Sequence, residues 1–215
     1  MITTLTLGFA MLSPAHAAKC DAYLRKAETA QSQELVKAFN DLATCEKETA
    51  ERNFTRFMTR ATDSEVLTQL SLAAIENDIW TPVWSMPGKI KSYEARDIIA
   101  GGIGGACTEN EKVVTFLQGA YAGLKDIDFQ QWDDALLACE SPELMTWMTG
   151  KIEDPPDRPF DAKFNTLMTV YTKKKGADAL GSLQKGAIDA AQSGGPYNTI
   201  LQQMNAAVTP TLGDI

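Results

Sequence analysis

The chain contains almost no histidine: among its 215 residues the only one is His16. Residues 1–17 are predicted below to be removed on export, so the mature protein would contain none. That absence excludes Ser-His and Cys-His nucleophile pairs, histidine-based metal sites and the usual general base near neutral pH. An enzyme formed by this chain would have to use carboxylates, lysine or tyrosine.

Motifs for metals and cofactors are also missing. The chain has four cysteines, and no two of them form the C-x-x-C pair typical of zinc sites. The glycine-rich stretch 101–105 lacks the preceding strand and the last glycine of a dinucleotide-binding loop, so it is interpreted as close helix packing or a helix break. We therefore expect no cofactor and no metal.

Positive charge and long apolar runs are scarce. The 28 acidic residues outnumber 20 basic ones, and a net charge of -8 disfavours binding to nucleic acid. After the N-terminal segment, no stretch reaches the roughly 18 apolar residues of a membrane span. We expect neither a nucleic-acid partner nor a membrane span.

The N-terminal segment has the features of an export signal. An apolar run from Leu5 to Leu12 is followed by Ser13-Pro14 and then by small residues at Ala15 and Ala17. This order predicts a signal peptide over 1–17, cleavage after Ala17, and a periplasmic or extracellular location.

Export makes disulfides the expected state of the four cysteines, which allow three pairings. Cys20 is predicted to begin a first helix and Cys45 to end the next, antiparallel one, while Cys107 and Cys139 occupy the same turn of two adjacent units. We predict the pairs Cys20–Cys45 and Cys107–Cys139. The second pair requires an unusually close approach, because helices pack at about 10 Å and a disulfide spans at most about 7 Å between Cα atoms.

A repeat is the strongest pattern that the sequence does contain. Polar breaks at Cys45, Ile75, Cys107 and Cys139 recur every 30 to 32 residues, and a bulky aromatic follows each break by eight or nine residues. These aromatics are Phe54, Trp84, Phe116 and Trp147. Such a period is typical of supersecondary units that complete each other's cores.

Helical periodicity fills the segments between the breaks. Leu35, Phe39 and Leu42 share one face, and the segment Thr62-Asp63-Ser64 is placed to cap the helix that follows it. The sequence predicts an all-α fold of stacked antiparallel helix pairs, a short α-solenoid of about five units of about 31 residues. We expect a repeat domain over 18–208 that ends with a capping helix from Tyr197 to about Val208, and a flexible tail over 209–215.

The helix pairs, their antiparallel order and their shared turn register, over roughly residues 33 to 190, resemble the HEAT-like α-solenoid repeat proteins. The repeat of that family is somewhat longer and usually keeps a proline and an Asp or Arg that this chain lacks at matching positions. The resemblance implies a curved scaffold that presents a concave face to another protein.

We interpret the chain as an exported, disulfide-stabilised helical-repeat scaffold that binds another protein, with Trp80 and Trp84 as candidates for lining a binding groove. Two alternatives stay open. A carboxylate-dependent hydrolase of cell-wall glycan would use Glu140 as its catalytic acid. A carrier of a small apolar ligand would enclose a cavity lined by Met and Trp.

Overall fold

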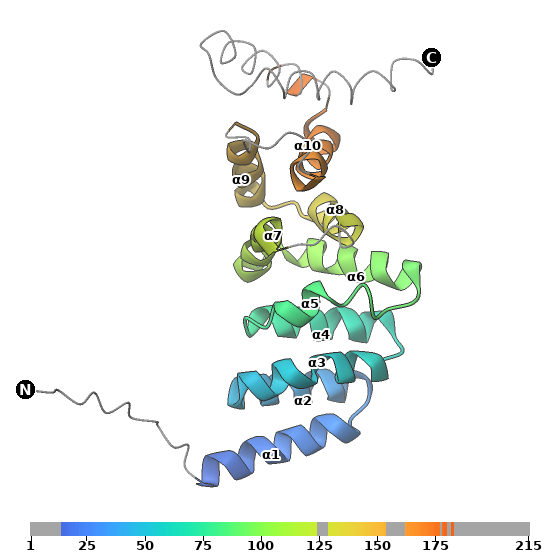
Figure 1. Ribbon diagram of the computed structural model, residues 1–215, viewed down its shortest axis with the longest axis vertical. Helices are drawn as coiled ribbons and strands as arrows, with labels where there is room; N and C mark the ends of the chain where they lie inside the picture. The colour runs from blue at the N-terminus through green and yellow to red at the C-terminus, as the bar shows by residue number, and fades with distance from the viewer. Residues whose placement is uncertain (1–13, 124–128, 154–161, 177, 180–181, 183–215) are drawn as a thin grey trace, which may run out of the picture. The chain divides into compact units, whose positions relative to one another are not determined.

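The computed structural model describes residues 14–123, 129–153, 162–176, 178–179 and 182. These residues form ten helices and no strand, so the prediction of an all-α fold is confirmed for the described residues (Figure 1). The helices are α1 (Pro14–Thr29), α2 (Ser32–Cys45), α3 (Lys47–Arg60), α4 (Ser64–Glu76), α5 (Thr81–Trp84), α6 (Tyr93–Ala106), α7 (Glu111–Gly123), α8 (Phe129–Ala138), α9 (Pro142–Glu153) and α10 (Ala162–Lys175).

The chain divides into two compact units, residues 1–89 and residues 90–215. We call them unit 1, which contains α1 to α5, and unit 2, which contains α6 to α10. The predicted repeat domain over 18–208 therefore spans both units.

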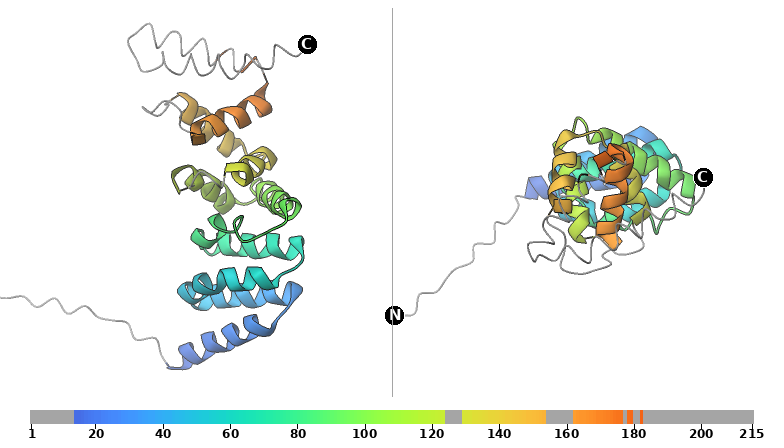
Figure 2. Two further views of the ribbon diagram at one scale, coloured as in Figure 1. Left: turned by 45° about the vertical axis from the view of Figure 1, so that its right-hand side comes forward. Right: turned by 90° about the horizontal axis from the view of Figure 1, so that it is seen from above.

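In unit 1, α2 contacts α1, α3 and α4, and α3 also contacts α1 and α4. The left view of Figure 2 shows α2 and α3 lying side by side. Their shared core is aromatic: the fully buried ring of Phe39 lies 5.5 Å from that of Phe54 and 6.1 Å from that of Phe57, both in edge-to-face arrangements. Aromatic rings bury large areas and favour this geometry, so the cluster fixes the α2–α3 pair.

Side-chain hydrogen bonds cap two helix ends in unit 1. Within the predicted cap 62–64, Asp63 is the residue that caps α4: its carboxylate accepts hydrogen bonds from the backbone N–H groups of Glu65 and Val66. At the C-terminal end of α1, the guanidinium of Arg60, the last residue of α3, donates to the carbonyl oxygens of Ala27 and Ala30, at 2.8 and 2.7 Å. A cation there satisfies carbonyls that the α1 helix leaves without partners and complements its dipole.

In unit 2, α8 contacts α6, α7 and α10, and α9 contacts α7 and α10. The buried Trp132 of α8 donates from Nε1 to the carbonyl oxygen of Leu117 in α7, at 3.0 Å. The Tyr121 ring lies 6.1 Å from that of Trp132 and 5.7 Å from that of Trp147. These rings join α7, α8 and α9.

Gly104 allows α6 and α8 to approach closely. A Cβ atom at this position would lie 2.3 Å from the carbonyl oxygen of Ala135 and 2.7 Å from the Cβ of Ala138, distances that atoms do not adopt. The glycine-rich stretch 101–105 lies inside α6, so it does not break the helix; close helix packing is the role of Gly104, whereas a Cβ at Gly101 or Gly105 would meet nothing within 4 Å. Gly104 precedes Cys107 by one turn, which places the two helices near each other where a disulfide joins them.

The predicted register matches the helix boundaries. Cys45 and Ile75 lie at the ends of α2 and α4, and Cys107 and Cys139 directly follow α6 and α8. The four aromatics that follow these breaks fall in α3, α5, α7 and α9. Two of them, Phe54 and Phe116, are buried, whereas Trp84 and Trp147 are half-buried.

Helix α1 starts earlier than the sequence predicts. It begins at Pro14, so Cys20 lies in its second turn and Ala17, the predicted cleavage position, lies within the helix. The alanines around Ala17 favour helix, and this preference extends the helix toward the N-terminus. Most of the predicted signal peptide, the capping helix over 197–208 and the tail over 209–215 lie outside the described residues.

Candidate functional site

A groove of about 360 Å³ runs along the junction of α2 and α4 in unit 1. Its lining comes from three residue types: exposed amides, exposed charges and smaller apolar side chains between them. The lining residues are Gln33, Val36, Lys37 and Asn40 on α2 and Gln69, Leu72, Ala73 and Glu76 on α4.

The positions of these residues follow from helical periodicity. Gln33, Lys37 and Asn40 are spaced i, i+4 and i+7 along α2, so they form one stripe beside the buried stripe of that helix. Gln69, Ala73 and Glu76 have the same spacing on α4. The two stripes border each other where α2 and α4 pack together.

One end of the groove is fixed by an amide pair. Asn77, the residue after α4, donates from Nδ2 to Oδ1 of Asn40 at 2.7 Å and to the carbonyl oxygen of Ala73 at 2.8 Å. The α4 end is thereby attached to α2. The amides of Gln33 and Gln69 can each donate and accept, which suits them to bind peptide groups.

Two disulfides lie in the described part of the chain. Cys20 is bonded to Cys45 and Cys107 to Cys139, with 5.6 Å between the Cα atoms of each pair. These are the two pairs that the sequence predicts. The close approach that the second pair requires is supplied by Gly104, as described above.

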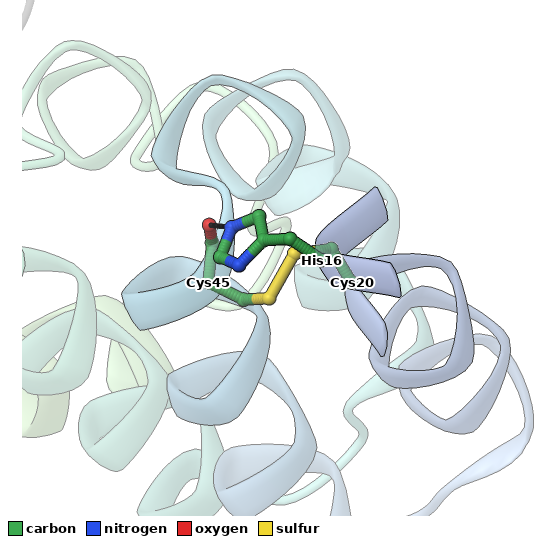
Figure 3. A group of neighbouring side chains, drawn as sticks. All are labelled: His16, Cys20 and Cys45. Atoms are coloured by element: carbon green, nitrogen blue, oxygen red, sulfur yellow. Dashed lines mark hydrogen bonds between the residues drawn. A yellow bond between two sulfur atoms is a disulfide. The ribbon is translucent and has the colours of Figure 1, made fainter. Parts of the chain in front are cut away.

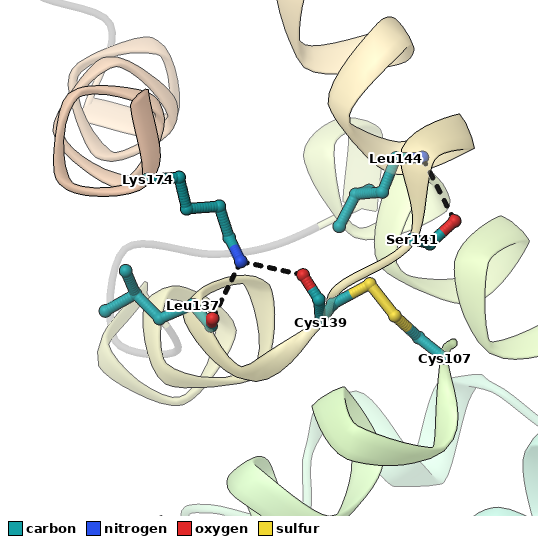
Figure 4. The surroundings of a disulfide bond; sticks show 6 residues. All are labelled: Cys107, Leu137, Cys139, Ser141, Leu144 and Lys174. Atoms are coloured by element: carbon teal, nitrogen blue, oxygen red, sulfur yellow. Dashed lines mark hydrogen bonds between the residues drawn. A yellow bond between two sulfur atoms is a disulfide. The ribbon is translucent and has the colours of Figure 1, made fainter. Parts of the chain in front are cut away.

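Lys174 of α10 lies beside the second disulfide. Its ammonium donates to the carbonyl oxygens of Leu137 and Cys139, at 2.8 and 2.7 Å, and so caps the end of α8 (Figure 4). Burial lowers the pKa of Lys174, and the charge of Glu140 partly opposes this shift. The arrangement parallels that of Arg60 in unit 1, where the last residue of α3 caps α1.

A carboxylate pair lies on the same helix, α8. Burial raises the pKa of Asp133, and the Lys173 ammonium, 3.8 Å from its Oδ2, opposes the shift. The other oxygen of Asp133, Oδ1, is buried and has no hydrogen-bond partner among the described residues. The pKa of Asp134 is raised first by burial and then by the charges of Asp97 and Asp133.

The tryptophans predicted to line a groove are on a different part of unit 1. Trp80 immediately precedes the short helix α5 and Trp84 ends it, and both side chains are half-buried. Helix α5 contacts α3 and α4. Neither tryptophan is among the residues that line the α2–α4 groove.

Glu140, the candidate acid of the hydrolase alternative, lies between α8 and α9 and is exposed. A general acid of that type needs a raised pKa, which usually comes from burial in an apolar pocket. Its exposed position therefore does not favour the hydrolase alternative.

Sequence reasoning missed the α2–α4 groove and the capping by Arg60 and Lys174. The sequence does contain a pattern that indicates the groove, since amides and charged residues recur at helical spacing next to apolar stripes. The caps carry none, because the carbonyls that they satisfy are 30 to 37 residues away in the chain.

Comparison with known proteins adds no family or fold assignment: no family model, no curated protein and no solved structure matches the chain. No helix in the described part of the chain is long and apolar enough to cross a membrane.

Proposed function

We propose that this protein is an exported scaffold of stacked helix pairs, stabilised by two disulfides, that binds another protein. Two features support the stacking. The helix ends follow the 30- to 32-residue register of the sequence, and within each unit helices contact both the next helix and the next but one. This pattern is typical of α-solenoid repeats, the architecture that the resemblance to HEAT-like proteins implies.

The observation that carries the binding proposal is the α2–α4 groove. Its exposed amides, Gln33, Asn40 and Gln69, can pair with peptide groups, while Lys37 and Glu76 can bind side chains of either charge. Val36 and Leu72 supply apolar contact between them. A partner with a polar segment and small apolar anchors would satisfy all three types of lining residue.

The two disulfides support the export part of the proposal. Both cysteine pairs are bonded, and the described residues contain no free cysteine. Structural disulfides form and persist in oxidising compartments such as the periplasm or the extracellular space. A scaffold that works there benefits from cross-links that limit the unfolded chain.

The test is quantitative capture of partners from the exported fraction of the native cell. The groove variant Gln33→Arg/Gln69→Arg adds two positive charges to exposed positions of the groove, and we expect it to lose the partners that the wild-type chain captures. The control is Glu48→Arg, which changes the net charge by the same amount at an exposed position of α3. If the groove variant and the control capture the same partners as the wild-type chain, the groove is not the binding surface.

A parallel variant, Trp80→Ala/Trp84→Ala, tests the surface predicted from the sequence. Loss of capture by this variant alone would move the binding surface to α5. Loss by the groove variant alone would place it at α2 and α4.

A further inference from the structure

A cluster of three residues of metal-binding type lies where α1 and α2 are joined by a disulfide. His16, Cys20 and Cys45 bring one imidazole nitrogen and two sulfur atoms to within 4.8 Å of one another (Figure 3). His16 and Cys20 are four residues apart on α1, so they share one face of that helix. Cys45 is the last residue of α2.

A hydrogen bond orients the imidazole within this cluster. His16 Nε2 lies 3.3 Å from the backbone carbonyl oxygen of Cys45. Because a carbonyl only accepts, Nε2 carries the proton in this bond, and Nδ1 is the nitrogen with the lone pair in the neutral ring. In Figure 3 that second nitrogen is on the side of the ring that faces the Cys45 side chain.

This arrangement is the one that histidine ligands of metals use. Such a histidine binds the ion through one nitrogen and donates from the other to a carbonyl or carboxylate, which fixes the tautomer and the ring orientation. In a tetrahedral zinc site the ligand atoms are about 3.5–4 Å apart, given Zn–S and Zn–N distances of about 2.3 and 2.0 Å. The three ligand atoms can reach that geometry by shifts of about 1 Å once the sulfur atoms separate.

We propose that His16, Cys20 and Cys45 form a redox-dependent zinc site: the reduced chain binds one Zn²⁺ through these three side chains, and the disulfide excludes it. The fourth ligand of the tetrahedral ion would be water. The proposal concerns a different surface from the α2–α4 groove and does not depend on the proposed function.

The change from disulfide to zinc site needs a reductant, which is an external dithiol. Two electrons and two protons from the dithiol cleave the bond between the sulfur atoms of Cys20 and Cys45 to give two thiols, and the donor becomes a disulfide. Binding of Zn²⁺ then releases one proton from each thiol, since zinc binds the thiolate. An external disulfide reverses both steps: the two thiolates form the Cys20–Cys45 bond, the external disulfide takes up two electrons and two protons to become a dithiol, and the ion is released.

The predicted processing of the N-terminus would limit when the site exists. Cleavage after Ala17, as the sequence predicts, would remove His16 and leave only the cysteine pair. With that cleavage, the zinc site would be confined to the reduced chain before processing.

The first test uses the full-length chain, reduced with a tertiary phosphine under anaerobic conditions, and compares alkylation of each cysteine without and with one equivalent of Zn²⁺. Zinc should slow alkylation of Cys20 and Cys45 at least about tenfold. The second pair, Cys107 and Cys139, is the internal control, and its alkylation rates should not change. Equal protection of both pairs, or protection of neither, overturns the proposal.

The second test measures Co²⁺ affinity from the visible bands of the tetrahedral ion, followed by competition with Zn²⁺, with far-UV circular dichroism as a check on folding. His16→Ala should weaken binding at least about tenfold, because even loss of an outer-shell partner costs about 10- to 100-fold in metal affinity. His16→Gln keeps a donor for the Cys45 carbonyl but is not a zinc ligand, so it should weaken binding to a similar degree. Wild-type affinity in either folded variant overturns the assignment of His16 as a ligand.

Discussion

Replacing Gly104 with alanine should weaken the packing of α6 against α8. The added Cβ would lie 2.3 Å from the carbonyl oxygen of Ala135, and ordinary contact begins at 3.4 Å, so the two helices would have to separate by about 1 Å. The obstacle is backbone, which cannot rotate away as a side chain can. Overpacking of this kind usually costs about 1–3 kcal/mol.

The same substitution has an opposite effect that must be separated from the clash. Alanine is favoured over glycine inside a helix by about 1 kcal/mol. Gly101→Ala is the matched control, because Gly101 lies in the same helix and a Cβ there would meet nothing within 4 Å. Since both variants share the helix-propensity gain, their difference in unfolding free energy isolates the clash, and we expect about 1–3 kcal/mol in favour of Gly101→Ala.

The assay is urea unfolding of the oxidised chain, followed by far-UV circular dichroism. Gly105→Ala serves as a second control, again with open space around the new Cβ. Separation of the helices would also stretch the Cys107–Cys139 pair from its 5.6 Å Cα distance toward the upper limit of about 6.8 Å. Equal stability of Gly104→Ala and Gly101→Ala would refute the argument that close packing requires a glycine at 104.

Three further predictions concern the caps, the buried acid and the disulfides. Arg60→Ala should lower the unfolding free energy by about 1–3 kcal/mol, because it leaves two helix-end carbonyls without their donor. Removing the exposed Arg56–Glu28 ion pair by Arg56→Ala should cost less than about 1 kcal/mol. Equal losses of the two variants in urea unfolding would contradict this ranking. The raised pKa of Asp133 means that the folded state keeps its proton over a range where the unfolded chain is already ionised, so stability falls as pH rises from 3.8 through the folded-state pKa. Asp133→Asn should therefore raise the unfolding free energy at neutral pH by less than about 1 kcal/mol after solvent screening, seen as a higher melting temperature. Near about pH 3 it should have no such effect. A gain of the same size at both pH values would exclude ionisation as the cause. Replacing both cysteines of either disulfide with serine should lower the unfolding free energy by about 3–4 kcal/mol, given sequence separations of 25 and 32 residues. A loss under about 1 kcal/mol would argue against loop entropy as the source of stabilisation.

Local patterns explain what could be predicted of the fold. Leu35, Phe39 and Leu42 are buried on one face of α2 as their spacing predicts, and Asp63 caps α4 where a short acidic side chain precedes an apolar run. Both effects depend on residues within two turns of each other, so the sequence alone contains the information. The start of α1 at Pro14 differs from the predicted start at Cys20, because alanines within residues 15–18 favour helix before that position.

The candidate site was less predictable. Trp80 and Trp84 stay candidates because aromatics are common at binding surfaces, whereas the lining of the α2–α4 groove includes polar side chains such as Gln33 and Gln69. Exposed amides are common on all helices, and only the packing of two particular helices makes these border a groove. The proximity of His16 to the first disulfide is likewise a tertiary result, since 29 residues separate His16 from Cys45.

The sequence by itself determined the helical class, because apolar residues recur at helical spacing along the chain. It also predicted both disulfides: Cys107–Cys139 from their shared position in the 30- to 32-residue spacing of the breaks, and Cys20–Cys45 from the antiparallel order of the first two helices. Only the tertiary structure decided which helices approach most closely, which carbonyls Arg60 and Lys174 cap, and where the groove lies. Those features arise between residues far apart in the chain, at distances of a few ångströms that no sequence spacing encodes. Gly104 shows the difference: its lack of a side chain is visible in the sequence, but the carbonyl oxygen that requires it is visible only in the fold.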